Sequence, residues 1–160
     1  NAILMRYIKI IFTLILINIV DQKIANITYD YFLIFPLTFL VYSFYVYKSD
    51  SITSSSEAFL FGLFVDIISE SFLGLNAIFF CLIAYFINIY SNTFKIFSYL
   101  QICLFFGLSS SAYVGFSQMI INIWNFSYIT LLVSSVFNII FCIFIAISSA
   151  YLPYFVKRRL

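Results

Sequence analysis

Long apolar runs broken by short polar stretches are the dominant pattern of this chain. A helix rises about 1.5 Å per residue, so crossing roughly 30 Å of hydrocarbon takes about 20 residues. Five runs are predicted to form membrane helices, at residues 5–20, 31–47, 72–90, 97–123 and 128–155. A sixth run, residues 57–68, is shorter and is consistent with either a short span or a loop.

The composition agrees with helices that lie in a membrane. Hydrophobic residues make up 64% of the 160-residue chain and charged residues only 9%, whereas about a quarter of an ordinary soluble domain is charged. So few charges cannot cover the surface of a soluble domain of this length. The connections are short and no linker interrupts the runs. We therefore expect one all-α, polytopic integral membrane domain over residues 1–160.

The distribution of basic residues decides between five and six spans. With six spans and both termini in the cytoplasm, all but one of the eight basic residues lie on the cytoplasmic side, and only Lys23 lies outside. With five spans, Lys95 and the C-terminal Lys-Arg-Arg run move outside, and the positive-inside rule fails. The sequence therefore predicts six transmembrane helices with both ends cytoplasmic. The residues on the predicted cytoplasmic side are Arg6, Lys9, Lys48, Lys95, Lys157, Arg158 and Arg159.

The short sixth run carries a helix start signal. The stretch "SSSE" at residues 54–57 has the Ser-x-x-Glu spacing of a capping box, with Ser54 as the N-cap and Glu57 reaching back to it. A helix from there to Phe72 is only roughly 25–30 Å long. We therefore expect a third helix that barely crosses the hydrocarbon, with its outer end submerged or beside a thinned membrane surface.

Two carboxylates lie inside the apolar stretch "GLFVDIISESFLGLN", residues 62–76. Gly62, Asp66, Glu70 and Gly74 recur every four residues, which predicts one face of a helix. Glycines allow a neighbouring backbone to approach, so carboxylates on that face are expected to meet protein or a water-filled cleft instead of lipid. The alternative is that they mark the outer, solvated end of a helix. Both readings stay open for Asp66, and the second is favoured for Glu70.

Asp66 is predicted to have a structural role. Its carboxylate is expected to accept hydrogen bonds from backbone N–H groups at the start of the fourth helix, around Gly74, Leu75 and Asn76. An anion at a helix N-terminus is stabilising by roughly 0.3–1 kcal/mol where exposed and by up to about 2 kcal/mol when partly buried. The bonds would fix the turn between the third and fourth helices.

No catalytic, cofactor-binding or metal-binding residues are predicted. Histidine is absent, and no nucleophile, metal-ligand set or basic clamp accompanies Asp66 and Glu70. Cys81, Cys103 and Cys142 lie scattered in apolar runs and are expected to be small buried hydrophobes. Because no basic tract could neutralise a run of phosphates, nucleic acid is not expected as a partner.

Small residues form faces on the last two predicted spans. Gly107, Ser111 and Gly115 are spaced by four, a pattern that brings membrane helices into close contact. The contact could be made within this protein or with a helix of a partner. The last span has a similar stripe in which Asn138 is expected to need hydrogen-bond partners. That stripe comprises Ser134, Asn138, Cys142, Ala146 and Ala150.

The stretch "FLFGLFVDIISESFLGLNAIFFCLIAYF", residues 59–86, resembles the signature of the bacterial rod shape-determining membrane protein MreD family. The resemblance is carried by a glycine, an aspartate four residues later, Leu-Gly and then Ala-Tyr. The element "SSVFN", which ends at Asn138, is similar to part of the family's last span. Phe35, before Pro36, stands where the family carries an arginine. Together with Asn76, the expected donor to Asp66, these residues form the predicted structural or partner-binding motif: Gly62, Asp66, Gly74, Asn76, Tyr85 and Asn138.

The resemblance implies a non-enzymatic inner-membrane component of the cell-wall elongation machinery, which couples MreB filaments to peptidoglycan synthesis. The implied partners are MreC first, then the peptidoglycan polymerase and transpeptidase of the elongation complex, with MreB contacted indirectly. The implied fold is similar to the substrate-binding subunits of energy-coupling-factor vitamin transporters. A small-molecule transport subunit is therefore the alternative. Such subunits usually carry an Ala-x-x-x-Ala face on the first helix, and "YIKIIFTLILINIV" has no alanine.

Overall fold

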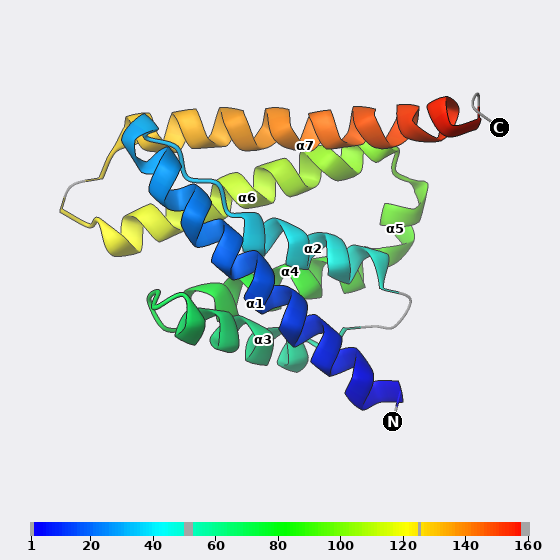
Figure 1. The fold of residues 1–160 in the computed structure, drawn as a ribbon, viewed down its shortest axis with the longest axis horizontal. Helices are drawn as coiled ribbons and strands as arrows, with labels where there is room; N and C mark the ends of the chain where they lie inside the picture. The colour runs from blue at the N-terminus through cyan, green and yellow to red at the C-terminus, as the bar shows by residue number, and fades with distance from the viewer. Residues whose placement is uncertain (1, 50–52, 125, 158–160) are drawn as a thin grey trace. The chain divides into compact units, whose positions relative to one another are not determined.

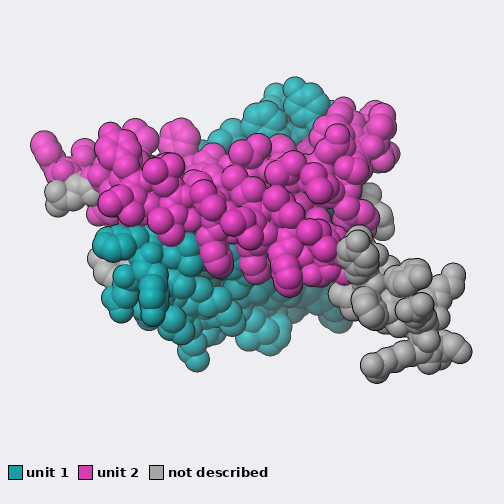
Figure 2. Space-filling view, turned by 90° about the horizontal axis from the view of Figure 1, so that it is seen from above, with its two compact units in different colours: residues 1–90 teal, residues 91–160 magenta. Residues whose placement is uncertain are grey.

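The computed structural model describes residues 2–49, 53–124 and 126–157, and within these ranges all regular structure is helical (Figure 1). The predicted all-α class is confirmed. The chain divides into two compact units, residues 1–90 and residues 91–160 (teal and magenta in Figure 2), which are described separately. The elements are α1 (Ala2–Thr28), the 3-10 helix η1 (Tyr29–Tyr31), α2 (Leu37–Lys48), α3 (Ser55–Ile68), α4 (Leu75–Ile89), α5 (Ser91–Ile96), α6 (Tyr99–Ile121) and α7 (Tyr128–Lys157).

Three helices of the described chain are long and apolar enough to cross a membrane, through Met5–Thr28, Tyr99–Ile121 and Tyr128–Ser148. Helices α2, α3 and α4 are shorter, with 12, 14 and 15 residues. At about 1.5 Å per residue, their lengths are roughly 18–22 Å. They are therefore shorter than the roughly 30 Å of a typical hydrocarbon core.

Unit 1 is built around the hairpin of α3 and α4. Helix α2 packs on α4, and α1 crosses α2 and α3 (Figure 1). The core between α2 and α4 is aromatic: the buried rings of Tyr42 and Phe80 are stacked with their centroids 4.0 Å apart. Phe39 and Phe61 lie beside this pair. Aromatic packing therefore holds α2 against the hairpin.

A glycine lets the two helices of the hairpin touch. A Cβ atom placed on Gly62 of α3 would lie 2.6 Å from the carbonyl oxygen of Asn76, and the backbone of Ala77 would be closer still. Real side chains essentially never come so close to backbone atoms. The α3 and α4 backbones are in direct contact here, which agrees with the expected role of a glycine in this motif.

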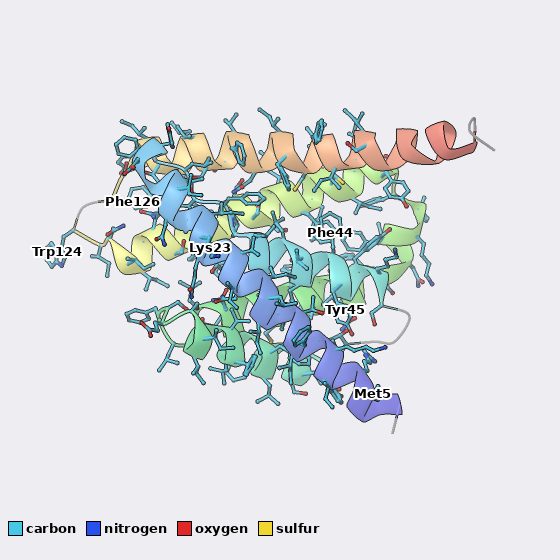
Figure 3. The ribbon with its side chains drawn as sticks, in the orientation of Figure 1. Met5, Lys23, Phe44, Tyr45, Trp124 and Phe126 are labelled. Atoms are coloured by element: carbon cyan, nitrogen blue, oxygen red, sulfur yellow. The ribbon has the colours of Figure 1, made fainter. Side chains whose placement is uncertain are left out.

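Polar side chains tie the N-terminal end of α1 to α2 and α3. Arg6 Nε donates to the Tyr45 hydroxyl at 3.0 Å, and a second guanidinium nitrogen donates to Ser49 Oγ at 3.3 Å. The Tyr7 hydroxyl donates to Glu57 Oε1 at 2.6 Å. Tyr45 can be followed in Figure 3 on α2.

Near its other end, α1 is tied to the start of α2 by a carboxylate. Asp21 accepts hydrogen bonds from the backbone N–H groups of Leu37 at 3.3 Å and Thr38 at 3.0 Å, and from the Thr38 hydroxyl at 2.6 Å. Pro36 is the N-cap and its side chain provides no cap. Asp21 therefore supplies the acceptor that the helix start requires.

Helix α3 begins with Ser54 as its N-cap, but the predicted capping box is wrong. The Ser54 side chain makes no cap hydrogen bond and instead lies 2.8 Å from Ser56 Oγ. The carboxylate of Glu57 is turned toward Tyr7 of α1. A contact between helices has replaced the local one. A complete capping box occurs instead at the start of α6, between Ser98 and Gln101.

Unit 2 consists of α5 and a packed pair, α6 and α7. A Cβ atom on Gly107 would lie 3.1 Å from Ile139 Cα, and one on Gly115 would lie 3.2 Å from Leu131 Cδ1. The small-residue face of α6 therefore packs within this protein. The predicted stripe on α7 is buried at Ser134, Asn138, Cys142 and Ala146, whereas the side chain of Ala150 lies outside the described residues.

The buried face of α6 is not centred where the spacing of small residues predicted. Gly107, Ser110 and Val114 are buried, whereas Ser111 and Gly115 are half-buried. Val114 does not belong to the four-residue spacing of small residues, yet its side chain is 0% exposed. A helical turn of 3.6 residues brings positions three and four apart onto one face, so Gly107, Ser110 and Val114 share it.

Gly107→Leu is expected to destabilise unit 2, because the new side chain meets the backbone of Ile139. Overpacking of this kind costs about 1–3 kcal/mol. Ala112→Leu on the exposed side of the same helix is the matched control and should be tolerated. Thermal melting in detergent measures both variants. Equal melting temperatures would contradict the close packing of α6 on α7.

Candidate functional site

The carboxylate of Asp66 is at the centre of a hydrogen-bond network that holds the α3–α4 hairpin. Its side chain is 1% exposed. Oδ1 accepts hydrogen bonds from Ser71 Oγ at 3.0 Å, the Asn76 backbone N–H at 3.0 Å and Asn76 Nδ2 at 2.9 Å. Oδ2 accepts from the backbone N–H groups of Gly74 at 2.9 Å and Ala77 at 3.3 Å. One side chain thereby binds the turn and the first residues of α4.

The sequence predicted this contact closely, with one wrong donor. Gly74 and Asn76 donate to Asp66 as expected, whereas the N–H of Leu75 donates to the carbonyl of Phe72 at 3.1 Å. Ala77 takes the place predicted for Leu75. Of the two readings left open for Asp66, the structure favours burial against protein.

Glu70 and Gly74 do not continue the helical face that was predicted through them. Helix α3 ends at Ile68, and both residues lie in the turn with positive φ angles of 50° and 98°. The helix ends here because the Ser71 N–H bonds back to the carbonyl of Asp66, while Ser69 Oγ donates to the carbonyl of Val65. Glu70 is exposed just beyond the end of α3.

Gly74 is the N-cap of α4 in a left-handed conformation. No atom lies within 4 Å of the position of a Cβ, so only backbone strain opposes a side chain. Gly74→Ala should therefore lower stability by about 1–2 kcal/mol, whereas asparagine tolerates this conformation better. Thermal melting of both variants tests the strain. An alanine variant that melts at or above the wild-type temperature would contradict it.

The Asp66 carboxylate is already saturated as a hydrogen-bond acceptor. A carboxylate offers roughly four lone-pair directions, and five donors already approach the Asp66 oxygens. Charge-assisted hydrogen bonds of this kind are stronger than neutral ones, and the start of α4 favours an anion. Little acceptor capacity is left for an ion or a substrate. The geometry suits a residue that fixes the backbone.

The structure brings together only part of the predicted motif. Gly62, Asp66, Gly74 and Asn76 meet at the hairpin. Tyr85 lies further along α4 and is 53% exposed, so its ring does not contribute to this network. Asn138 belongs to unit 2, where it is buried on α7, and Gly107, Ser111 and Gly115 belong to α6.

Sequence reasoning missed two participants and one related contact. Ser71 and Ala77 also donate to Asp66. Ala77 directly follows the predicted donors, and this position was the available signal, because an N-terminal turn presents several N–H groups at once. Ser71 donates through its hydroxyl, which the pattern of a helix start does not indicate. Asp21 makes the same kind of contact, because its carboxylate accepts a hydrogen bond from a backbone N–H group at the start of α2. No local pattern relates Asp21 to Thr38, which lies 17 residues away.

The fold and the site define a helical membrane protein in which a buried carboxylate organises a helical hairpin. Among the described residues, no three His, Cys, Asp or Glu side chains are grouped so that they could hold a metal ion. The family model described as rod shape-determining protein MreD matches residues 3–150. The chain belongs to the MreD family, as its resemblance predicted. Membership indicates a role in determining rod shape.

Searches among curated proteins and among solved structures gave no significant match. The expected likeness to the substrate-binding subunits of energy-coupling-factor transporters therefore stays a prediction.

Proposed function

We propose that this protein is a non-enzymatic scaffold of the cell-wall elongation machinery in the bacterial inner membrane. It binds MreC and thereby links MreB filaments to peptidoglycan synthesis and rod-shape maintenance. The observation that carries the proposal is the α3–α4 hairpin. Gly62, Asp66 and Gly74, which are part of the family-like motif, are the residues that fix its backbone.

A fixed hairpin suits a scaffold because a preorganised surface loses little conformational freedom when a partner binds. Gly62 sets the distance between α3 and α4, and Asp66 sets the turn between them. Tyr85 presents a half-exposed ring on the same hairpin. We propose that MreC binds this surface, and that the polymerase and transpeptidase of the elongation complex assemble around this protein and MreC.

The proposed topology has six spans, with both units in one membrane domain and both termini in the cytoplasm. The distribution of basic residues supports it. The short α2, α3 and α4 would require a locally thinner bilayer. Trp124 and Tyr128 are exposed at the ends of α6 and α7, where aromatic rings favour the membrane interface. Trp124 projects from its loop in Figure 3.

Reporter fusions test this topology directly. Fusions after Asn92 and after Leu160 are both expected to report a cytoplasmic location, because this places all the basic residues except Lys23 inside. A fusion after Asp30, in the connection between α1 and α2, should report a periplasmic location. A periplasmic signal at Leu160 would overturn the six-span arrangement.

Rescue of cell shape tests the function. A rod-shaped bacterium that lacks its own MreD-family protein is supplied with this chain together with the MreC of the same source. Rod shape should return, and MreC should co-purify with the chain. Round cells at normal abundance of the chain would contradict the proposal. Specific binding of a vitamin in detergent, without capture of MreC, would favour a transport subunit instead.

A further inference from the structure

The tip of the α3–α4 hairpin presents apolar side chains outward. Phe72 is 63% exposed and Leu73 is 69% exposed, and both lie in the turn that connects the two helices. Ile67, in the last turn of α3, is exposed as well. Large apolar side chains that are exposed together in this way mark a surface that contacts lipid or another protein. The tip is therefore matched to an apolar surrounding.

The lengths of the two helices limit how far the tip can lie from the other end of the hairpin. Polar contacts mark the other end of the hairpin, where Glu57 bonds to Tyr7 and Asn88 Nδ2 donates to the Thr53 carbonyl at 2.7 Å. From there α3 rises through 14 residues and α4 through 15. These correspond to roughly 21–22 Å, which is shorter than the roughly 30 Å of hydrocarbon. A hairpin that starts at one interface therefore ends before the other.

A chain reversal in hydrocarbon is possible only if its backbone groups find partners within the protein. The start of α4 meets this condition. The N–H groups of Gly74, Asn76 and Ala77 donate to Asp66. The N–H of Leu75 donates to Phe72 O at 3.1 Å, and that of Ile78 donates to Gly74 O at 2.9 Å. The donors that water usually satisfies at a helix start are all occupied.

The serine side chains of the turn also form hydrogen bonds within the protein, whereas Glu70 forms none with the described residues and therefore limits how deep in the membrane the turn can lie. Ser69 Oγ bonds to the carbonyl of Val65 and to Ser71 Oγ, and Ser71 Oγ bonds to Asp66. Glu70 is exposed. Because a charged carboxylate avoids hydrocarbon, its side chain must reach the headgroups. The turn therefore lies at the boundary between headgroups and acyl chains.

We propose that the α3–α4 turn ends within the leaflet, with Phe72 and Leu73 among phospholipid acyl chains and Glu70 at the headgroup boundary. The bilayer surface is lowered around the turn. Asp66 makes this position possible because it replaces water as the acceptor for the start of α4. A partner that contacts the tip does so with a transmembrane helix and not with a soluble domain.

Tryptophan fluorescence in vesicles tests this depth. Trp124 is the chain's single tryptophan, so Trp124→Phe gives a silent background. Phe72→Trp and Leu73→Trp are introduced one at a time. Leu60→Trp on the exposed side of α3 serves as the lipid-facing control, and Ser56→Trp near the start of α3 as the interface control. The proteins are reconstituted in phosphatidylcholine and phosphatidylglycerol vesicles, with or without bromine on the acyl chains.

Both tip variants should emit at short wavelength and lose emission to brominated lipids as strongly as the Leu60→Trp control. They should resist quenching by aqueous iodide. Long-wavelength emission that iodide quenches and brominated lipids do not would overturn the proposal. Leu73→Trp, at the more exposed position, decides the result if Phe72→Trp lowers the melting temperature.

Discussion

Gly62→Leu should prevent the α3–α4 hairpin from forming, with loss of folded protein from the membrane. A Cβ atom alone would lie 2.6 Å from the Asn76 carbonyl oxygen and would overlap the backbone of Ala77. These are backbone atoms of a helix and cannot rotate away. Separation of the helices would also pull the N–H groups of Asn76 and Ala77 away from Asp66. Ordinary overpacking costs about 1–3 kcal/mol, and this change combines it with the loss of buried hydrogen bonds.

A pair of alanine variants isolates the close approach. Gly62→Ala meets the α4 backbone, whereas Gly115→Ala meets only Leu131 Cδ1, the end of a flexible side chain, at 3.2 Å. Alanine is favoured over glycine within a helix by about 1 kcal/mol, so Gly115→Ala should be neutral or slightly stabilising. Gly62→Ala should instead melt well below wild type. Similar melting of both variants would mean that α3 and α4 do not touch at this point.

Asp66→Leu should have the second large effect, because it removes both side-chain oxygens that accept hydrogen bonds from the turn and the start of α4. The N–H groups of Gly74, Asn76 and Ala77 would be left buried without this partner. Each buried donor left unsatisfied costs about 1–3 kcal/mol. We expect low abundance of the variant, loss of rod shape and loss of MreC from the purified protein.

Asp66→Asn should fall between wild type and Asp66→Leu. An amide oxygen can still accept hydrogen bonds, so part of the function should be retained. In the structure, however, both carboxylate oxygens accept hydrogen bonds. In an asparagine the amide nitrogen replaces one of these oxygens, and it would meet N–H or O–H donors instead of acceptors. We therefore expect a partial loss of function.

Cell shape, abundance and MreC capture should be scored together for these variants. Glu70→Gln is the matched control, since that carboxylate is exposed in the turn, and it should behave as wild type. A structural role predicts that function and abundance decline together from wild type to asparagine to leucine. Complete loss of shape control in Asp66→Asn, at normal abundance and normal MreC capture, would instead indicate a role for the charge itself.

Local features of the sequence predicted the helices and the hairpin well. Apolar runs located α1 to α4, α6 and α7, but not the short α5. The carboxylate eight residues before Gly74 was correctly connected to the start of α4. The start of α2 was predicted at Tyr31 but lies at Leu37. Pro36 explains the shift, because proline disfavours helical geometry in the residue that precedes it.

Contacts between distant residues could not be predicted in the same way. Glu57 had a local capping pattern, yet Tyr7, 50 residues away, provides its hydrogen bond. The spacing of small residues on α6 favoured Gly115 for the packed face, yet Val114 is the more buried position. The hydrogen-bond partner of Glu57 and the buried position on α6 both depend on which helix packs alongside. The periodicity of one helix does not identify that neighbour.

The central claim, that MreC reads the fixed hairpin, is tested most directly by photocrosslinking in cells. A photoreactive amino acid is placed singly at exposed positions of the hairpin, Leu60, Ile78, Leu82 and Tyr85, and at Leu108, Phe116 and Leu132 of unit 2 as comparison sites. Crosslinks to MreC should form from hairpin positions in an otherwise wild-type chain. They should be lost when Asp66→Leu is added and the amount of chain is matched. Crosslinks to MreC from unit 2 alone, or hairpin crosslinks that persist in Asp66→Leu, would contradict it.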